Sequence, residues 1–256
     1  MNETQTKTAI TDTSSGQIRI RGYDITELIG RLSFAEGVYL VLKGELPNEK
    51  EKAMMEGILV SSLDHGVTPP STLAARTVLS GGNPLNTAVA AGIMTIGDAH
   101  GGAIEQCARI LQEKARDMKD AGETAKALVE ELRQENKRMP GYGHRIHKKD
   151  PRTIRLLQLA EEVGFKGKHI ELALKIEEEL ERSTGKSLPL NVDGTIAAII
   201  SEMGFDWRLG KGFFIISRTP GLVAHVYEEW TREKPMRHLG HSDYLYDGPA
   251  HRSIRM

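Results

Sequence analysis

Apolar side chains recur at three- and four-residue intervals along most of the chain, which is the spacing of one face of an α-helix. The stripe in residues 48–63 consists of Met54, Met55, Ile58, Leu59 and Leu63. Comparable stripes begin at N-capping residues such as Asp24, Ser33 and Asn48 or end at glycines such as Gly44. They predict about ten helices between residues 24 and 230. A two-residue alternation is clear only in Ile18-Arg-Ile20, which is long enough for an edge strand. The pattern therefore predicts a compact all-α protein.

Three segments depart from this pattern. Residues 85–97 are apolar nearly all round, which predicts a buried central helix. Residues 1–16 are polar and lack the apolar core of a signal peptide, so we expect a flexible arm. The tail from Thr231 onward is polar and cannot form a core by itself. It is either disordered or an arm that docks on a partner subunit.

Composition narrows the possible partners and compartment. A net charge of −1 provides no global field that would attract nucleic acid or an anionic membrane. The longest apolar stretch, residues 87–96, is too short to span a bilayer. The single cysteine, Cys107, excludes a disulfide within the chain and is typical of a reducing cytoplasm. We therefore expect a soluble cytoplasmic protein that binds neither nucleic acid nor membrane.

Candidate chemistry lies at breaks between the expected helices, where ionisable residues combine with glycine or proline. The breaks are residues 64–66, 97–102, 140–152 and 191–194. At such breaks side chains can reach a cleft and backbone N–H groups are free. Taken singly, Asp98 and Asp193 are equally well explained as helix N-caps, and His65 and His100 as ordinary helix-end or solvent-facing residues.

Neither a metal site nor a dinucleotide site is well supported by these breaks. His144 and His147 stand three residues apart, but no cysteine pair and no HExxH motif accompanies them. Gly141-Tyr-Gly143 lacks the third glycine of a dinucleotide loop, and no expected strand precedes it. We therefore predict no metal site.

Several blocks, taken in order, resemble the citrate synthase superfamily. They are Arg19–Leu28, Leu32–Glu36, Gly44–Pro47, Asp64-His65 with Ser71, Thr72 and Arg76, His100–Gly102, Gly141–Arg145 with Asp150–Arg152, Asn191–Asp193, and Arg218 with Gly221 and Ala224-His225. Together they cover about residues 17–240. Within the superfamily, two segments resemble the citryl-CoA lyase branch, residues 95–98 and 190–194. The chain is also shorter than an ordinary citrate synthase, which favours the same branch. That branch includes the carboxy-terminal module of ATP-citrate lyase.

The resemblance implies a citrate-synthase-like, all-α architecture. After the arm of residues 1–16, a large helical domain would comprise residues 17–102 and 205–256. A small CoA-binding helical domain would comprise residues 103–204. The active site would lie in the cleft between the domains, whose closure on substrate excludes water. The expected assembly is a homodimer or a higher homo-oligomer.

The resemblance also implies catalytic roles around a thioester enol or enolate. Asp193 would carry the methyl proton of acetyl-CoA. A neutral imidazole, from His100 or alternatively from His65, would hydrogen-bond the thioester oxygen as negative charge develops on it. His144 would transfer the proton of the keto-acid oxygen.

Arginines would bind the substrate's carboxylates, which their planar guanidinium groups match in geometry. By block position these are Arg145, Arg152 and Arg218, and the resemblance places His65 among the substrate-binding residues as well. Arg237 is either a solvated surface residue or an arginine that reaches in from a neighbouring subunit. The residues implied in CoA binding are Met139, Pro140, Gly141, Tyr142 and Gly143. The coenzyme A thioester is then a substrate, and no tightly bound cofactor is implied.

The favoured function is cleavage of citryl-CoA to acetyl-CoA and oxaloacetate. The alternative is a citrate or 2-methylcitrate synthase that condenses an acyl-CoA with oxaloacetate. A further alternative is a non-catalytic subunit that binds CoA or carboxylates. Because no phosphate-binding loop is found, any ATP-dependent formation of citryl-CoA would belong to a separate partner polypeptide.

Overall fold

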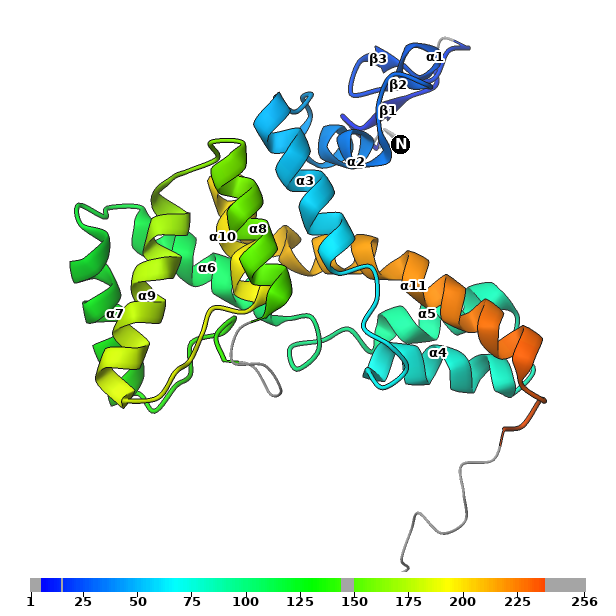
Figure 1. Cartoon of the computed structure of the whole chain (residues 1–256). Helices are drawn as coiled ribbons and strands as arrows, with labels where there is room; N and C mark the ends of the chain where they lie inside the picture. The colour runs from blue at the N-terminus through cyan, green and yellow to red at the C-terminus, as the bar shows by residue number, and fades with distance from the viewer. Residues whose placement is uncertain (1–5, 15, 144–149, 238–256) are drawn as a thin grey trace, which may run out of the picture.

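Local sequence signals set the ends of many helices in the computed structural model, which describes residues 6–14, 16–143 and 150–237. Ser33 and Asn48 each form a capping box at the start of a helix, and Gly44 ends one with a left-handed backbone (φ +94°). The helices are α1 (Ile25–Leu28), α2 (Phe34–Lys43), α3 (Glu49–Ser61), α4 (Pro70–Ser80), α5 (Leu85–Met94), α6 (Ala103–Ala115), α7 (Ala121–Gln134), α8 (Pro151–Glu162), α9 (Lys168–Thr184), α10 (Val192–Glu202) and α11 (Gly210–Arg232), with the short 3-10 helix η1 (Trp207–Leu209) before α11 (Figure 1). The predicted all-α class is confirmed.

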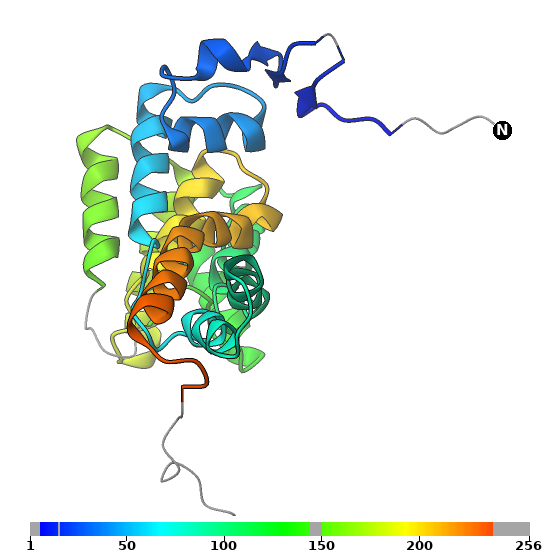
Figure 2. The same cartoon turned by 90° about the vertical axis from the view of Figure 1, so that its right-hand side faces the viewer.

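A small antiparallel sheet precedes the helices. Its strands are β1 (Thr11–Asp12), β2 (Arg19–Ile20) and β3 (Tyr23–Asp24), in the order β1-β2-β3. The strand expected at residues 18–20 therefore forms, but it lies in the middle of the sheet. β1 falls within the segment expected to be a flexible arm, so part of that segment is paired. Figures 1 and 2 show the sheet beside α2, at one end of the molecule.

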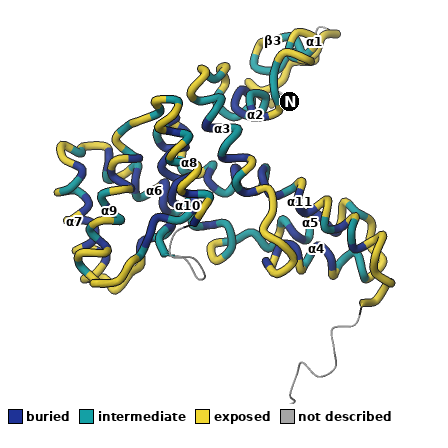
Figure 3. Tube along the Cα trace, in the orientation of Figure 1, coloured by how far each residue is buried: buried dark blue, intermediate teal, exposed yellow. Residues whose placement is uncertain are grey.

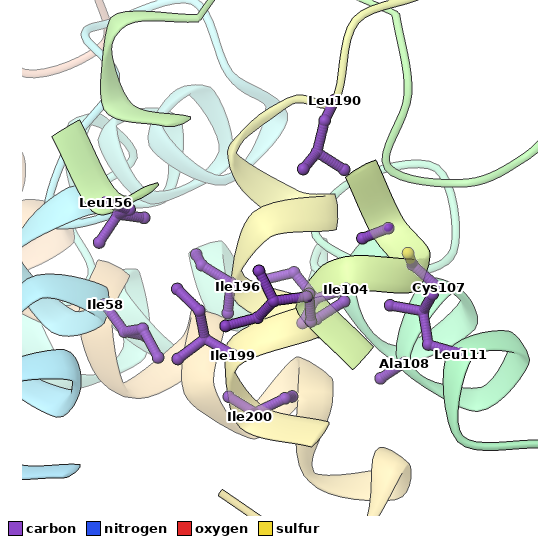
Figure 4. Packing of buried hydrophobic residues seen from close by; sticks show 14 of the residues in the cluster. Ile58, Ile104, Cys107, Ala108, Leu111, Leu156, Leu190, Ile196, Ile199 and Ile200 are labelled. Atoms are coloured by element: carbon purple, nitrogen blue, oxygen red, sulfur yellow. The ribbon is translucent and has the colours of Figure 1, made fainter. Parts of the chain in front are cut away.

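The larger hydrophobic core surrounds α10, which is buried along nearly its whole length. Small and aliphatic side chains cover all sides of α10, so it can be enclosed by α3, α6, α8 and α9. The side chains labelled in the close-up of this packing are Ile58, Ile104, Cys107, Ala108, Leu111, Leu156, Leu190, Ile196, Ile199 and Ile200 (Figure 4). The buried central helix of the fold is therefore α10.

The apolar segment 85–97 forms α5, which is not central in this chain. α5 packs against α4 and α11 in a second, smaller cluster that contains Ala88, Val89 and Leu222. Its other face is open, and Met94 is 85% exposed. The expectation of a buried central helix is corrected here, because in the described part of the chain α5 packs mainly against α4 and α11. Figure 3 shows how far each residue of these helices is buried.

α11 connects the two clusters. Phe213 and Phe214, near its start, belong to the larger cluster, whereas Leu222 and Val226 belong to the smaller one. Residues of α2 and α3 share the larger cluster with residues of α6–α10. The expected domain division at residue 103 stays a prediction. Among the described residues, no helix is long and apolar enough to cross a membrane.

Candidate active site

The first turn of α10 presents Asp193. Asn191 caps the helix, and its Oδ1 accepts hydrogen bonds from the backbone N–H groups of Asp193 (3.0 Å) and Gly194 (3.2 Å). The backbone of Gly141 passes directly over this turn, because a Cβ built on Gly141 would stand 2.6 Å from the Cα of Gly194. Gly141 also has a φ of +82°, so glycine is required there for both reasons.

Asp193 is surrounded by charges that act on its pKa in opposite directions. Burial raises the pKa, the guanidinium groups of Arg152 and Arg218 lower it, and the carboxylate of Asp150 raises it. The net direction is upward from the usual value. A carboxylate whose pKa is raised is a stronger base, and it is protonated at a higher pH than an ordinary carboxylate. Asp193 is therefore suited to proton transfer.

Arg152 stands at the start of α8 beside a buried carboxylate. Its Nε and Nη2 donate to the two oxygens of Asp150 at 3.0 and 2.8 Å, and Asp150 is also the N-cap of α8. Burial opposes ionisation of Asp150, but the hydrogen bonds from Arg152 outweigh it, and the pKa of Asp150 is lowered. Asp150 therefore fixes the direction of Arg152 near Asp193.

Arg218 is almost fully buried, at 2% exposure, on the inner side of α11. Its Nε donates to the carbonyl of Ser62 (3.0 Å), and its guanidinium carbon lies 4.8 Å from the centre of the Phe214 ring. Burial lowers the pKa of Arg218, whereas the charges of Asp64 and Asp193 raise it. Arg218 thus carries its charge into the space between α10 and the loop that follows α3.

His100 is held by a tight turn before α6. Gly97 and His100 exchange two backbone hydrogen bonds of 3.0 Å, and a salt bridge of 2.8 Å from Lys211 to Asp98 ties the turn to α11. The Nε2 of His100 lies 2.9 Å from the Oγ of the fully buried Ser71. Burial lowers the pKa of His100, and the charges of Arg218 and His65 lower it further, which favours the neutral imidazole.

His65 lies on the exposed loop between α3 and α4. Asp64 accepts a hydrogen bond from the backbone N–H of Gly66 (2.8 Å) and pairs with the Nε2 of His225 (2.9 Å). Because His65 acts electrostatically on His100, the two histidines considered for the thioester oxygen lie near each other. The structure therefore brings His65, His100, Asp193, Arg152 and Arg218 into one electrostatic neighbourhood.

The segment expected to bind CoA runs antiparallel to the residues before α10. Gly143 donates its backbone N–H to Pro189 (2.7 Å), and Asn191 donates its backbone N–H to Gly141 (3.0 Å). Asn191 also donates its side-chain amide to the carbonyl of Gly143 (3.0 Å), and the Tyr142 hydroxyl donates to Ala173 (2.8 Å). One residue, Asn191, therefore links this segment to the turn that presents Asp193.

A cavity of about 700 Å³ opens beside this segment between α7 and α9. Its lining combines apolar side chains with cationic ones. The lining residues from the expected CoA segment are Met139, Tyr142 and Gly143, and the cationic ones are Arg133, Lys137, Arg138 and Lys186. Such a combination suits a ligand with both a ring system and phosphate groups. Pro140 and Gly141 belong to the same segment but do not line this cavity.

Three of the expected site residues cannot be added to this neighbourhood: two lie outside the described residues, and the third lies elsewhere in the described structure. His144 and Arg145 lie outside the described residues. The Nε of Arg237 lies 3.1 Å from Glu229 Oε1, and its backbone N–H donates to the Ser80 hydroxyl (2.8 Å). Glu229 follows Arg218 by eleven residues in α11, a rise of about 16 Å. Arg237 is therefore remote from Asp193 within one chain.

A known protein family matches most of the chain. The family model described as citrate synthase, C-terminal domain, matches residues 1–59 and 47–239. The chain belongs to the citrate synthase family. The resemblance seen in the sequence blocks is thereby confirmed.

Individual members of the family extend the comparison. The structure is similar to that of citryl-CoA lyase from Hydrogenobacter thermophilus, with 52% identity, a TM-score of 0.92, and coverage of 98% of this chain and 97% of that one. Citrate synthase from Haloferax volcanii is 32% identical over 85% of this chain, and ATP-citrate synthase beta chain protein 1 from Arabidopsis thaliana is 29% identical over 88% of it. The chain spans 57% and 38%, respectively, of the length of these two curated relatives.

Several contacts around these candidate residues were not predicted from the sequence. Ser71 was noted only as part of a block, and neither Phe214, beside His100 and Arg218, nor Lys211 was noted at all. Ser71 and Phe214 are far from His100 in sequence, and Lys211 is far from Asp98, so no short-range pattern marks these contacts. The cations of the cavity carry a weak signal, since Lys137 and Arg138 come directly before the expected CoA segment. Among the described residues, no group of three or more His, Cys, Asp or Glu side chains is arranged to hold a metal ion.

Proposed function

We propose that this chain cleaves citryl-CoA to acetyl-CoA and oxaloacetate. The observation that carries the proposal is the Asp193 carboxyl with its raised pKa, presented by the first turn of α10 within the field of Arg152 and Arg218. The 52% identity to a citryl-CoA lyase over nearly the whole length of both chains supports the lyase direction.

In this proposal two side chains transfer protons, His144 and Asp193. His144 takes the proton of the citryl hydroxyl group, and the electrons of that O–H bond form the ketone of oxaloacetate. The carbon–carbon bond breaks, and its electron pair passes to the thioester as an enolate. Asp193 then donates a proton to the methylene carbon and so forms the methyl group of acetyl-CoA. A raised pKa favours the protonated Asp193 that this step requires.

We assign the thioester oxygen to His100 and keep His65 as the alternative. The lowered pKa of His100 favours a neutral ring at pH 7. If the Ser71 hydroxyl donates to Nε2 of His100, the proton of the ring resides on Nδ1 and can be donated to the oxyanion. His65 is more exposed than His100, on the loop between α3 and α4, and would also contact the substrate.

The guanidinium groups of Arg152 and Arg218 would bind the carboxylates of the substrate, together with Arg145. The cavity beside Met139, Tyr142 and Gly143 would hold CoA, with its phosphates among the cations that line the cavity. No tightly bound cofactor takes part in this scheme. The ATP-dependent step that makes citryl-CoA would belong to another polypeptide.

A homodimer or higher homo-oligomer completes the proposal. Residues 85–97 contain no charged side chain, yet Met94 on α5 is 85% exposed in one chain. A second copy that covers α5 would bury this face, and Arg237 would then reach a site in that copy. Sedimentation of Met94→Glu against wild type tests this, since a species of unchanged mass would argue against α5 as the interface.

The rival function is a citrate synthase, which the 32% identity to the Haloferax volcanii enzyme keeps open. Citryl-CoA is supplied, and oxaloacetate and free thiol are measured separately. A lyase produces oxaloacetate without free CoA. Sustained release of CoA from acetyl-CoA and oxaloacetate would instead establish a synthase. The Asp193→Ala variant should lose turnover and still bind CoA. If the wild-type protein binds CoA but turns over neither citryl-CoA nor acetyl-CoA with oxaloacetate, the chain is a non-catalytic subunit.

A further inference from the structure

The loop that carries His65 is held against one face of α11. Arg218, Gly221 and His225 are three and four residues apart, so they lie on the same side of the helix. Arg218 donates to the carbonyl of Ser62 (3.0 Å), and the Nε2 of His225 lies 2.9 Å from Asp64 Oδ1. The loop is therefore fixed on both sides of Gly221 by side chains from a single helix face.

Gly221 lets this loop approach the helix closely. A Cβ built on Gly221 would stand 3.2 Å from Asp64 Oδ1 and 3.3 Å from Asp64 Cβ, and it would overlap with the carbonyl oxygen of Leu63. No side chain separates the loop from the helix at this point. A small change at the neighbouring contact of His225 would therefore be transmitted directly to the backbone of the loop.

Asp64 is bound through both carboxylate oxygens. Oδ1 faces His225, and Oδ2 accepts the backbone N–H of Gly66 (2.8 Å), so His65 lies between two fixed residues. Burial alone would raise the pKa of Asp64, but the hydrogen bonds from Gly66 and His225 outweigh it and keep the pKa low. An ionised carboxylate only accepts hydrogen bonds, so His225 must be the donor.

The surroundings of His225 leave Asp64 as its hydrogen-bond partner. Its Nδ1 is 3.9 Å from Glu228 Oε2, which is beyond hydrogen-bond distance. Glu228 is itself paired with Arg76 at 3.3 Å and with Arg232 at 2.7 Å. The His225 ring is mostly buried, at 13% side-chain exposure, although it lies next to an exposed loop.

We propose that His225 is a positioning residue, which acts through Asp64 to hold His65 in reach of the substrate and of His100. This inference rests on the proposed citryl-CoA cleavage. His225 touches no reacting atom in this scheme. Its contribution is the placement of the His65 backbone, since misplacement by about 1 Å of a group that contacts substrate costs on the order of 10²-fold in rate.

A double-mutant cycle tests the proposal, with kcat/KM for citryl-CoA cleavage measured in wild type, His225→Ala, His65→Ala and the double variant. We expect His225→Ala to lose on the order of 10²-fold. In the His65→Ala background the same change should cost nothing further, because the side chain that it positions is already absent. His225→Gln, whose amide can donate to Asp64, should recover most of the loss. Thr231→Ala, on the same helix but bonded only to carbonyls of that helix, is the matched control.

Different failures have different meanings. If wild type yields no oxaloacetate from citryl-CoA, the proposed function is wrong. If wild type is active but the losses from His225→Ala and His65→Ala multiply, or if either variant turns over normally, the positioning role of His225 is wrong. Should His225→Ala fail to fold, Asp64→Asn replaces it in the cycle, since it keeps the side-chain size and removes one acceptor oxygen. Asp64→Asn should reduce the rate when it is introduced into the wild-type protein, and it should leave the rate unchanged when it is introduced into His65→Ala.

Discussion

The hydrogen bond between Ser71 and His100 can be tested by removing a single oxygen atom. The Ser71 hydroxyl is fully buried and lies 2.9 Å from the Nε2 of His100. Ser71 is not the N-cap of α4, so Ser71→Ala leaves the helix start intact. Loss of such a bond costs about 1–2 kcal/mol. Because 1.36 kcal/mol corresponds to a tenfold change in rate, we expect kcat to fall by about 5- to 30-fold.

The assay is release of oxaloacetate from citryl-CoA at varied substrate concentration. KM should stay near its wild-type value, because Ser71 orients a group that contacts the developing oxyanion and does not itself bind substrate. Thr72→Val is the matched control. Thr72 is equally buried, and its hydroxyl has no hydrogen-bond partner among the described residues. We expect Thr72→Val to keep wild-type kcat and to unfold at an equal or higher temperature.

A wild-type kcat in Ser71→Ala would refute this reasoning. It would mean that the ring of His100 is oriented without the hydroxyl, by its turn and by the edge of the Phe214 ring alone. A fall in kcat that Thr72→Val reproduces would point instead to a general disturbance of α4. Only a loss confined to Ser71→Ala supports the orienting role.

Three further substitutions, two of them paired with a control substitution, test the stability and binding parts of the structure. Asp193→Asn should abolish turnover, and it should raise the unfolding temperature at pH 7 but not at pH 3. The reason is that a carboxyl group whose pKa is raised in the folded state stabilises that state at low pH and loses this contribution as the pH rises. Gly194→Ala places a Cβ against the facing backbone, so we expect it to lower the free energy of unfolding by about 1–3 kcal/mol in urea titrations. Gly212→Ala, where a Cβ meets no atom, should be neutral or stabilising. Lys186→Gln should raise KM for citryl-CoA several-fold at low salt, and Lys175→Gln, which does not line the cavity, should not.

Features that depend on neighbours in sequence were predicted well. The N-caps Asp24, Ser33 and Asn48 and the glycine stop at Gly44 all occur where the sequence indicated, because capping involves residues only two to four positions apart. Asp193 remains a predicted site residue, taken from its block. Its position in the first turn of α10 follows from Asn191, which is two residues away.

Features that depend on distant contacts were not predicted. The apolar pattern of residues 85–97 predicted burial, but pattern alone does not say whether the covering surface comes from the same chain. The pair Asp64 and His225 joins residues 161 positions apart, and each residue type is common on helix ends. Similarly, the strand at residues 19–20 was expected at a sheet edge, because the short β1 partner has no alternation of its own.

The charges around Asp193 also link substrate binding to proton supply. In the free protein Arg152 and Arg218 lower the pKa of Asp193, although burial raises it overall. Substrate carboxylates that pair with these guanidinium groups would neutralise that lowering effect, so the pKa of Asp193 should rise further in the complex. Cleavage requires protonated Asp193, and kcat/KM reports the free enzyme whereas kcat reports the complex. The high-pH limb of the kcat profile should therefore fall at a higher pH than that of kcat/KM. Coincident limbs, or a limb that moves to lower pH on binding, would show that the arginines do not couple substrate carboxylates to the proton of Asp193.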